Sequence, residues 1–326
     1  MAWVIRMSVA CALAAMLAPS AGYAQERYPT RPIRLVIPYA PGGGTDVMAR
    51  RFAIRMGPVL GRNLVPDNRG GAGGNICTAE VARAAPDGYT LLVGVSSTLA
   101  INPWAMVNAS YDAERDFTPI VVLGVVPMAI VAHPSVGTSL KQVIARAAGM
   151  PGKLSYGSAG IGTINHLAFE LFRKEAGGLD IVHVPYKGSG PAVQELIAGQ
   201  IPFVAATFSA MLGHHRSGRV RILAVTSERR SRSEPAIPTA VEQGLPGLVA
   251  STWQALLAPA GTPKAAIDTL HRASLVVFAD EAFQKDLETL AIEPVADSSP
   301  ESATRFIAQE RARWGPIVRD SGFKLE

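Results

Sequence analysis

Short apolar runs rich in β-branched residues alternate along this chain with longer stretches in which apolar side chains recur every three or four positions. Runs of about five residues predict β-strands, and the longer pattern predicts amphipathic helices. We predict strands at 33–37, 64–65, 90–95, 120–125, 128–132, 154–156, 181–184, 203–206 and 222–225. We predict helices at 46–60, 75–85, 139–148, 163–176, 190–198, 211–217, 264–278, 281–290 and 299–321.

The order of these elements predicts the fold class. A strand followed by a helix, repeated many times, is typical of βαβ units, in which helices cover both faces of a parallel sheet. The chain has 326 residues, and a length of this size favours about two domains. We therefore expect an α/β protein built on parallel sheets and divided into two parts.

The N-terminal residues do not fit this pattern and resemble an export signal. Arg6 is the only charged residue before Glu26, residues 7–17 are predominantly apolar, and small residues Gly22 and Ala24 precede Gln25. A charged start, a short apolar segment and small residues before a cut are typical of a secretory signal peptide. The apolar run is shorter than the roughly 20 residues that span a bilayer. We predict a signal peptide at residues 1–24 and export of the remaining chain.

Composition and charge exclude several classes of protein. Apolar residues make up 48% of the chain and charged residues 17%, which excludes disorder as its main state. Loss of the signal peptide lowers the net charge from +5 to +4. Basic residues concentrate only at 216–232, without interleaved aromatic residues, so we expect no nucleic-acid partner. Cys77 is the only cysteine after residue 24, and we predict that it is a small buried side chain.

Two glycine-rich loops carry the candidate chemistry. Each follows a predicted strand and precedes a predicted helix, one at 40–46 (APGGGTD) and one at 156–163 (YGSAGIGT). Glycine lets the backbone approach a ligand closely, and free N–H groups at a helix N-terminus favour an anion. Two such loops, far apart in sequence, are suited to a ligand held between two parts of the protein. The alternative is that both are plain strand-to-helix turns with Asp46 and Thr163 as N-caps.

Enzyme motifs are incomplete in this chain. Neither loop has the Gly-Lys-Ser/Thr of a phosphate-binding loop, and the glycines at 157–162 reverse the dinucleotide-binding order. Residues 94–98 begin like a nucleophile elbow, but Thr98 replaces the final glycine. The histidines show no metal-binding spacing, so we predict no metal and no cofactor. The remaining enzyme hypothesis is a secreted α/β serine hydrolase that acts on a carboxylic ester with Ser158 or Ser96.

Seven segments together resemble one protein family. They are YPTRPI (28–33), PYAPGGGTD (38–46), NRGGAGGN (68–75), APDGYTLL (85–92), YGSAG (156–160), VPYKG (184–188) and LAPAGTP (257–263). In this order they are similar to the Bug family, the TctC-type periplasmic receptors of tripartite tricarboxylate transporters. The resemblance spans nearly all of the chain after residue 25.

The resemblance implies a type II periplasmic-binding-protein fold, in which two α/β lobes flank a cleft and two segments form the hinge. It places lobe one at 26–124 and 250–326, and lobe two at 125–249. It implies a periplasmic solute receptor, not an enzyme, that binds a small carboxylate and delivers it to membrane permease subunits. We expect a monomer. The resemblance does not identify the ligand, which could be a dicarboxylate, a citrate-like acid, an aromatic acid or a neutral nicotinamide-like compound.

The family's ligand-binding positions carry over to both glycine loops. The first loop supplies Ala40, Gly43, Gly44, Thr45 and Asp46, and the second supplies Ser158, Ala159, Gly160 and Thr163. Three further candidates lie at the ends of two other strands: Ser96, Ser97 and Thr207. Because Lys187 is the only basic residue that we expect near any of the loops, we predict that neutral donors hold the carboxylate. These are backbone N–H groups of both loops and the hydroxyls of Thr45, Ser158 and Thr163.

Overall fold

The computed structural model describes residues 28–39, 41, 44–108, 110–186, 188–289, 291–295, 298–322 and 324–325. The predicted signal peptide lies outside these residues. Within them the strands are β1 (Ile33–Ile37), β2 (Leu64–Asn68), β3 (Thr90–Val95), β4 (Phe117–Ala132), β5 (Leu154–Ser158), β6 (Ile181–Pro185), β7 (Phe203–Thr207), β8 (Arg221–Val225) and β9 (Ser251–Pro259). They form one sheet in the order β2-β1-β3-β9-β4-β7-β5-β6, and β8 pairs with β4.

The helices lie close to the positions that the sequence pattern predicts. They are α2 (Gly44–Leu60), α3 (Asn75–Ala82), α4 (Asn102–Ala105), α5 (Leu140–Ala148), α6 (Ile164–Glu175), α7 (Ser189–Ile197), α8 (Phe208–Arg216), α9 (Lys264–Ala279), α10 (Glu281–Thr289) and α11 (Pro300–Ser321). A short π-helix, η2 (Ser97–Ile101), follows β3 directly. The short helices η2 and α4 were not predicted.

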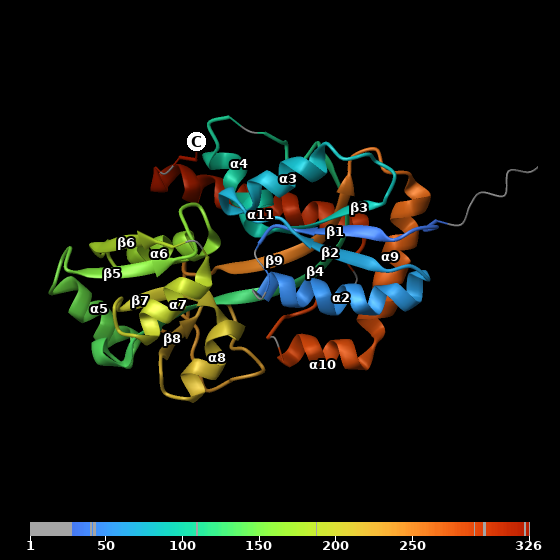
Figure 1. Ribbon diagram of the computed structural model, residues 1–326. Helices are drawn as coiled ribbons and strands as arrows, with labels where there is room; N and C mark the ends of the chain where they lie inside the picture. Colours follow the sequence, from blue (N-terminus) through green and yellow to red (C-terminus); the bar gives the residue numbers. More distant parts are fainter. Residues whose placement is uncertain are drawn as a thin grey trace, which may run out of the picture.

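Strands β4 and β9 connect the two halves of the sheet (Figure 1). On one side β1 pairs in parallel with β2 and β3, and on the other β5 pairs in parallel with β6 and β7. Strand β4 pairs with β9 from Phe117 to Pro127 and with β7 from Met128 to Ala132. It is therefore one continuous element shared by both halves.

This continuity corrects two sequence predictions. Residues 120–125 and 128–132 were expected to be separate strands, yet both belong to β4. Pro127 is tolerated inside this strand because the pairing partner changes there, from β9 to β7. Strand β9 was not predicted, because its sequence, STWQALLAP, lacks a β-branched run and contains two alanines.

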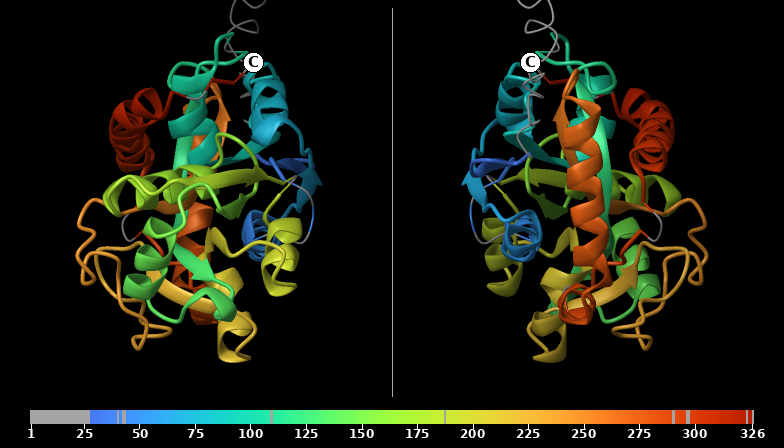
Figure 2. Two further views of the ribbon diagram at one scale, coloured as in Figure 1. Left: turned by 90° about the vertical axis from the view of Figure 1, so that its left-hand side faces the viewer. Right: turned by 90° about the vertical axis from the view of Figure 1, so that its right-hand side faces the viewer.

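Helices cover both faces of the sheet, as predicted, but the sheet is mixed and not purely parallel, because β4 and β9 pair antiparallel with their neighbours. Along β1, Ile33, Leu35 and Ile37 pack in the core that contains α2 residues, whereas Val36 packs in the core that contains α11 residues. Figure 2 shows α2 and α11 on opposite sides of the sheet. The loops at the strand ends are thus held on a rigid, buried framework.

Polar contacts fix the helices to this framework. The indole nitrogens of the buried Trp253 on β9 and Trp314 on α11 both donate to Glu310 Oε2, at 3.0 and 3.3 Å. Ser139 is the N-cap of α5, and its hydroxyl accepts from Gln142 N at 3.3 Å. The described helices include none with the length and apolar character needed to cross a membrane.

Cys77 is a buried residue of α3, as predicted. Its Sγ lies 3.2 Å from Gly74 O, and burial raises the pKa of the thiol to about 11. The thiol is therefore protonated at neutral pH and is not an activated nucleophile.

Candidate functional site

The first glycine loop joins β1 to α2, and polar side chains fix its described part. Helix α2 begins at Gly44, so Asp46 lies inside its first turn and is not its N-cap. The buried Asp46 carboxylate accepts from Arg50 Nε at 2.8 Å and from Asn68 Nδ2 at 2.9 Å. Asn68 Nδ2 also donates to Tyr39 O at 2.9 Å. These bonds tie the start of α2 to the ends of β1 and β2.

The start of α2 leaves room and donors for a ligand. Gly44 is exposed, and a Cβ atom added there would meet no atom within 4 Å. The Thr45 hydroxyl has no hydrogen-bond partner among the residues that the structure describes. The first N–H groups of a helix have no partner within the helix, and its dipole favours an anion there. The predicted site residues Ala40 and Gly43 lie outside the described residues.

Arg50 is a basic side chain that the sequence prediction missed. We expected Lys187, which lies outside the described residues, to be the only basic residue near the loops. Arg50 binds Asp46 and also donates from Nη2 to Asn68 Oδ1 at 2.6 Å. The spacing of four residues between Asp46 and Arg50 on one helix was the signal for this pair. Arg50 therefore corrects the expectation of a single basic residue near the loops, and recognition by neutral donors stays a prediction.

The second glycine loop, after β5, uses its hydroxyl groups internally. Ser158 Oγ accepts from Gly160 N at 3.1 Å and lies 2.7 Å from His183 Nε2. Thr163 Oγ1 donates to Gly160 O at 2.7 Å and accepts from His166 N at 3.4 Å, which makes Thr163 the N-cap of α6. In this structure both hydroxyls therefore maintain the shape of the loop.

Backbone groups are the donors that this loop leaves free. Gly160 has φ +130°, a conformation that favours glycine. With the loop in this shape, the N–H groups of Ala159 and Ile161 have no hydrogen-bond partner within the described part of the chain. Ile161 is half exposed, and the N-terminus of α6 adds a favourable potential for an anion.

A stack of aromatic rings supports the second loop. The His183 ring lies between those of Tyr156 and His166, with centroid distances of 4.7 and 4.2 Å, and Tyr156 also stacks on Phe169 at 4.0 Å. Burial lowers the pKa of His183 to about 4 and also lowers that of His166. Both rings are therefore neutral at pH 7, and a neutral His183 Nε2 can accept the hydroxyl proton of Ser158.

The Ser158–His183 pair has the composition of a nucleophile and its base, but not the required geometry. Ser158 is only 1% exposed, and its Oγ also contacts Gly160 N and O. No described residue hydrogen-bonds His183 Nδ1 to orient the ring, as the third member of a triad would. This pair therefore gives no support to the hydrolase alternative.

The other predicted residues lie at the ends of β3 and β7. Ser96 and Ser97 are buried, and Ser96 Oγ lies 3.3 Å from Thr252 Oγ1 on β9. Burial raises the pKa of the Tyr39 phenol, and a hydrogen bond with Ser97 opposes the rise. Thr207 is half-buried at the start of α8, and its hydroxyl makes no cap. Thr207 is therefore the most exposed of these three residues.

Asn102, which the sequence prediction missed, brings the two halves of the site together. With its amide nitrogen facing carbonyl oxygens, Asn102 donates to Gly162 O at 3.1 Å and to Ser97 O at 3.3 Å. Its oxygen then accepts from the Asn75 amide nitrogen at 3.3 Å. The segment after β3 is thus hydrogen-bonded to the loop after β5. Nothing in the sequence indicated this contact, because the partner at Gly162 is a backbone carbonyl.

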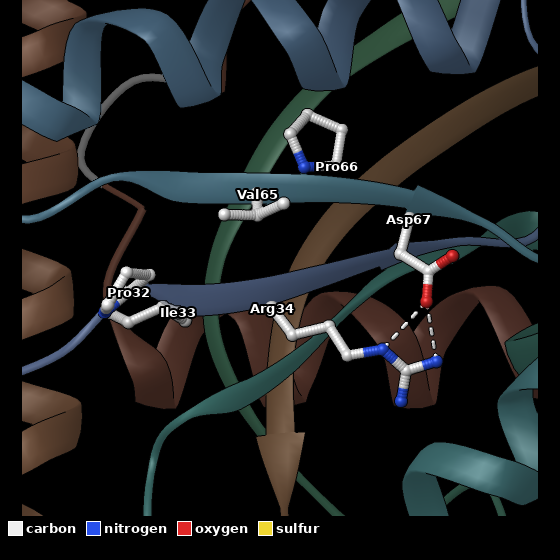
Figure 3. Close-up of a pocket in the computed structure, with 6 residues that line it drawn as sticks. All are labelled: Pro32, Ile33, Arg34, Val65, Pro66 and Asp67. Carbon is white, nitrogen blue, oxygen red and sulfur yellow. Dashed lines mark hydrogen bonds and ion pairs between the residues drawn. The ribbon is translucent and has the colours of Figure 1, made fainter.

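A separate surface hollow lies away from these loops. It has a volume of about 410 Å³ and lies at the free edge of the sheet, between β1 and β2. Figure 3 shows the Arg34 side chain pointing towards Asp67, and 2.7 Å separates Arg34 Nη2 from Asp67 Oδ2. None of the predicted site residues lines this hollow.

The fold and the paired loops define a class of protein, the two-lobed α/β binding proteins. The model of the tripartite tricarboxylate transporter family receptor, TctC, matches residues 48–323. The chain belongs to this family, whose members are solute-binding receptors. Its fold is the type II periplasmic-binding-protein fold that the sequence predicted. The boundaries of the two lobes stay a prediction.

Individual relatives cover nearly the whole chain. Protein BugT of Bordetella pertussis is 39% identical over 303 residues, which is 92% of each chain. The structure of R. palustris Rpa4515 with adipate is 33% identical, with a TM-score of 0.86, over 91% of this chain and 99% of that one. MatC from Rhodopseudomonas palustris with bound malate is 29% identical, with a TM-score of 0.83, over 89% of this chain and 100% of that one.

Proposed function

We propose that the protein is a periplasmic receptor that binds a small carboxylate between its lobes and delivers it to membrane permease subunits. Its family supports the receptor role, and two relatives of similar fold hold adipate and malate. The observation that carries the proposal for this chain is the second loop. In that loop the hydroxyls of Ser158 and Thr163 bond to Gly160 and fix the shape of the backbone. In this shape the N–H groups of Ala159 and Ile161 have no partner among the described residues.

The two loops belong to different lobes in this proposal. Residues 26–124 and 250–326 form lobe one, which carries the loop before α2, and residues 125–249 form lobe two, which carries the loop before α6. A ligand that contacts both loops binds the closed form more tightly than the open form, so it shifts the population towards closure. The hydrogen bond from Asn102 to Gly162 O supports contact between the lobes at this point.

Neutral donors recognise the carboxylate in this proposal. The N–H groups of Ala159 and Ile161 act from lobe two, and the first turn of α2 with the Thr45 hydroxyl acts from lobe one. Thr207 adds a second free hydroxyl. Each hydrogen bond to a charged group contributes about 1.5–3 kcal/mol, so a few donors suffice for binding without a basic side chain. Ser158, Thr163 and Asp46 position the loops and do not touch the ligand.

The remaining parts of the proposal concern the fate of the ligand. The protein acts as a monomer in the periplasm after its signal peptide, residues 1–24, is removed. The ligand leaves chemically unchanged, because no described group near Ser158 has the arrangement of a catalytic triad. The partner is the permease of a tripartite transporter, as the family description implies.

Calorimetry on the mature protein tests this function. We expect adipate or malate to bind with one-to-one stoichiometry, and the corresponding diamides to bind at least about a hundredfold more weakly. Native mass spectrometry of the protein purified from periplasm should show an intact small acid. Binding of the diamide as tightly as the diacid, or chemical turnover of a carboxylic ester that is lost in Ser158→Ala, would contradict the proposal.

A further inference from the structure

Gln254 occupies a distinctive place on β9. It is opposite Val95, the last residue of β3, and opposite Gly124 on β4. Ser96 and Ser97 follow Val95 directly, and Thr252, two positions from Gln254, contacts Ser96. Gln254 therefore lies where β9 passes the end of β3, between the two halves of the sheet.

The pleat of β9 shows which way the Gln254 side chain points. Alternate residues of a strand share a face. Leu256 and Ala258 pack in the core that contains Met48 and Phe52 of α2, whereas Trp253 and Ala255 pack in the core on the other face. Gln254 therefore points to the α2 face of the sheet. It does so at the end where β3 finishes, which is also the end where β1 finishes and α2 begins.

The amide of Gln254 is buried without a partner. The residue is 3% exposed, its Oε1 is inaccessible and unbonded, and no described residue hydrogen-bonds its Nε2. A buried polar group without a partner is unfavourable, and each such group calls for an explanation. By contrast, Gln243 donates from Nε2 to Leu223 O at 2.9 Å.

We propose that Gln254 contacts the ligand from the floor of the cleft and selects acids that carry a second polar oxygen. This inference rests on the proposed function. The glycine loops hold one carboxylate, and the Gln254 amide offers a donor and an acceptor to a further carboxylate or hydroxyl group. The substrate class is then a small dicarboxylate or hydroxy acid, not a simple monocarboxylate. If Gln254 only packed against its neighbours, burying its amide would cost free energy without a compensating hydrogen bond.

Two substitutions and one matched control test this role. Gln254→Met keeps the approximate size and removes both polar groups, and Gln254→Glu keeps the shape but places a carboxylate beside the ligand. The control is Gln243→Met, which removes a hydrogen-bonded glutamine of lobe two. The probes are malate, adipate and hexanoate, measured by calorimetry on the mature protein, together with the thermal midpoint of each protein without ligand.

We expect Gln254→Met to weaken binding of malate or adipate at least about tenfold, and Gln254→Glu to weaken it further. The preference for adipate over hexanoate should shrink in both variants. The midpoint of Gln254→Met without ligand should be unchanged or higher, because an unsatisfied amide has been removed. Gln243→Met should lower the midpoint and leave the affinities unchanged.

The opposite pattern overturns the inference. If Gln254→Met binds malate and adipate within about twofold of wild type, or only loses thermal stability as Gln243→Met does, Gln254 is a structural residue and the proposed function stands. If the wild-type protein binds neither malate nor adipate, nor any other acid found with the periplasmic protein, the proposed function fails and the inference fails with it.

Discussion

The two glycine loops look alike in sequence but are built differently. In the loop before α6, Ser158 and Thr163 both bond to Gly160, and Gly160 has φ +130°. At the start of α2, Gly44 has open space beside it, and Thr45 has no described partner for its hydroxyl. The first arrangement uses side chains to shape the backbone. The second leaves a helix N-terminus accessible.

The same glycine-rich sequence pattern can therefore contain residues of two kinds, those that maintain the shape of the loop and those that face the ligand. A residue that maintains loop shape affects both stability and binding when it is replaced, whereas a residue that only faces the ligand affects binding alone. The predictions below use pairs of substitutions, one in each loop, to test that distinction.

The largest effect is expected from the glycines. In Gly160→Ala, the added Cβ would make an ordinary contact with Tyr186 O at 3.4 Å, but φ +130° is a strained conformation for alanine. We expect a loss of about 1–3 kcal/mol in the free energy of unfolding and at least about a hundredfold weaker binding of adipate. Gly44→Ala should keep wild-type stability and weaken binding alone. Chemical denaturation measures the stability of both variants. If they lose the same stability, the two loops do not differ in the way proposed here.

A smaller effect is expected from the hydroxyls. Ser158→Ala leaves Gly160 N without its acceptor and should lower the free energy of unfolding by about 1–3 kcal/mol. Thr45→Val should leave stability unchanged and weaken carboxylate binding about tenfold. Denaturation and calorimetry on the same preparations measure both quantities. A Thr45→Val protein that loses stability but binds normally would show that Thr45 shapes its loop as Ser158 does.

Asn102 tests whether contact between the loops matters to the ligand. In Asn102→Asp, a carboxylate would face the carbonyl oxygens of Gly162 and Ser97 and repel them. We expect roughly tenfold faster ligand dissociation, with little change in the association rate, because the bond forms when the lobes close. Stopped-flow kinetics measures both rates. An unchanged dissociation rate would show that this bond does not support closure.

The smallest effect concerns pH and the second loop alone. Burial lowers the pKa of His183 to about 4 from its usual 6.5, so between these values the unfolded chain binds more protons than the folded one. Stability should therefore fall as the pH decreases from 6.5 and should level off below 4. The expected loss is about 1–2 kcal/mol, after allowance for solvent screening of a half-buried ring. His183→Gln should flatten the profile, and an unchanged slope would contradict this origin.

Local patterns in the sequence were enough to predict most of the fold. The runs predicted at 33–37 and 203–206 are strands because their apolar residues suit a buried sheet, and Ser139 caps α5 as its position before an amphipathic stretch indicates. Strand β9 was not predictable in this way, because long-range pairing with β3 and β4 forms it. Pairing across the sheet outweighs the weak strand propensity of its residues.

The candidate site could be predicted only in part. The glycine loops were visible because glycine and a following helix are neighbours in sequence. The contact of Ser158 with His183, 25 residues away, depends on the pairing of β5 with β6. That Gln254 Oε1 has no partner among the described residues depends on the packing around β9. Sequence therefore indicates which loops matter, whereas tertiary contacts decide which of their groups stay free.

The central claim is that neutral groups of the two loops hold the carboxylate. Its most direct test is calorimetric titration of adipate, or of the acid found with the periplasmic protein, into wild type, Lys187→Ala and Gly160→Val. We predict that Lys187→Ala binds within about threefold of wild type and that Gly160→Val shows no measurable binding. Loss of binding in Lys187→Ala with normal binding in Gly160→Val would contradict the claim.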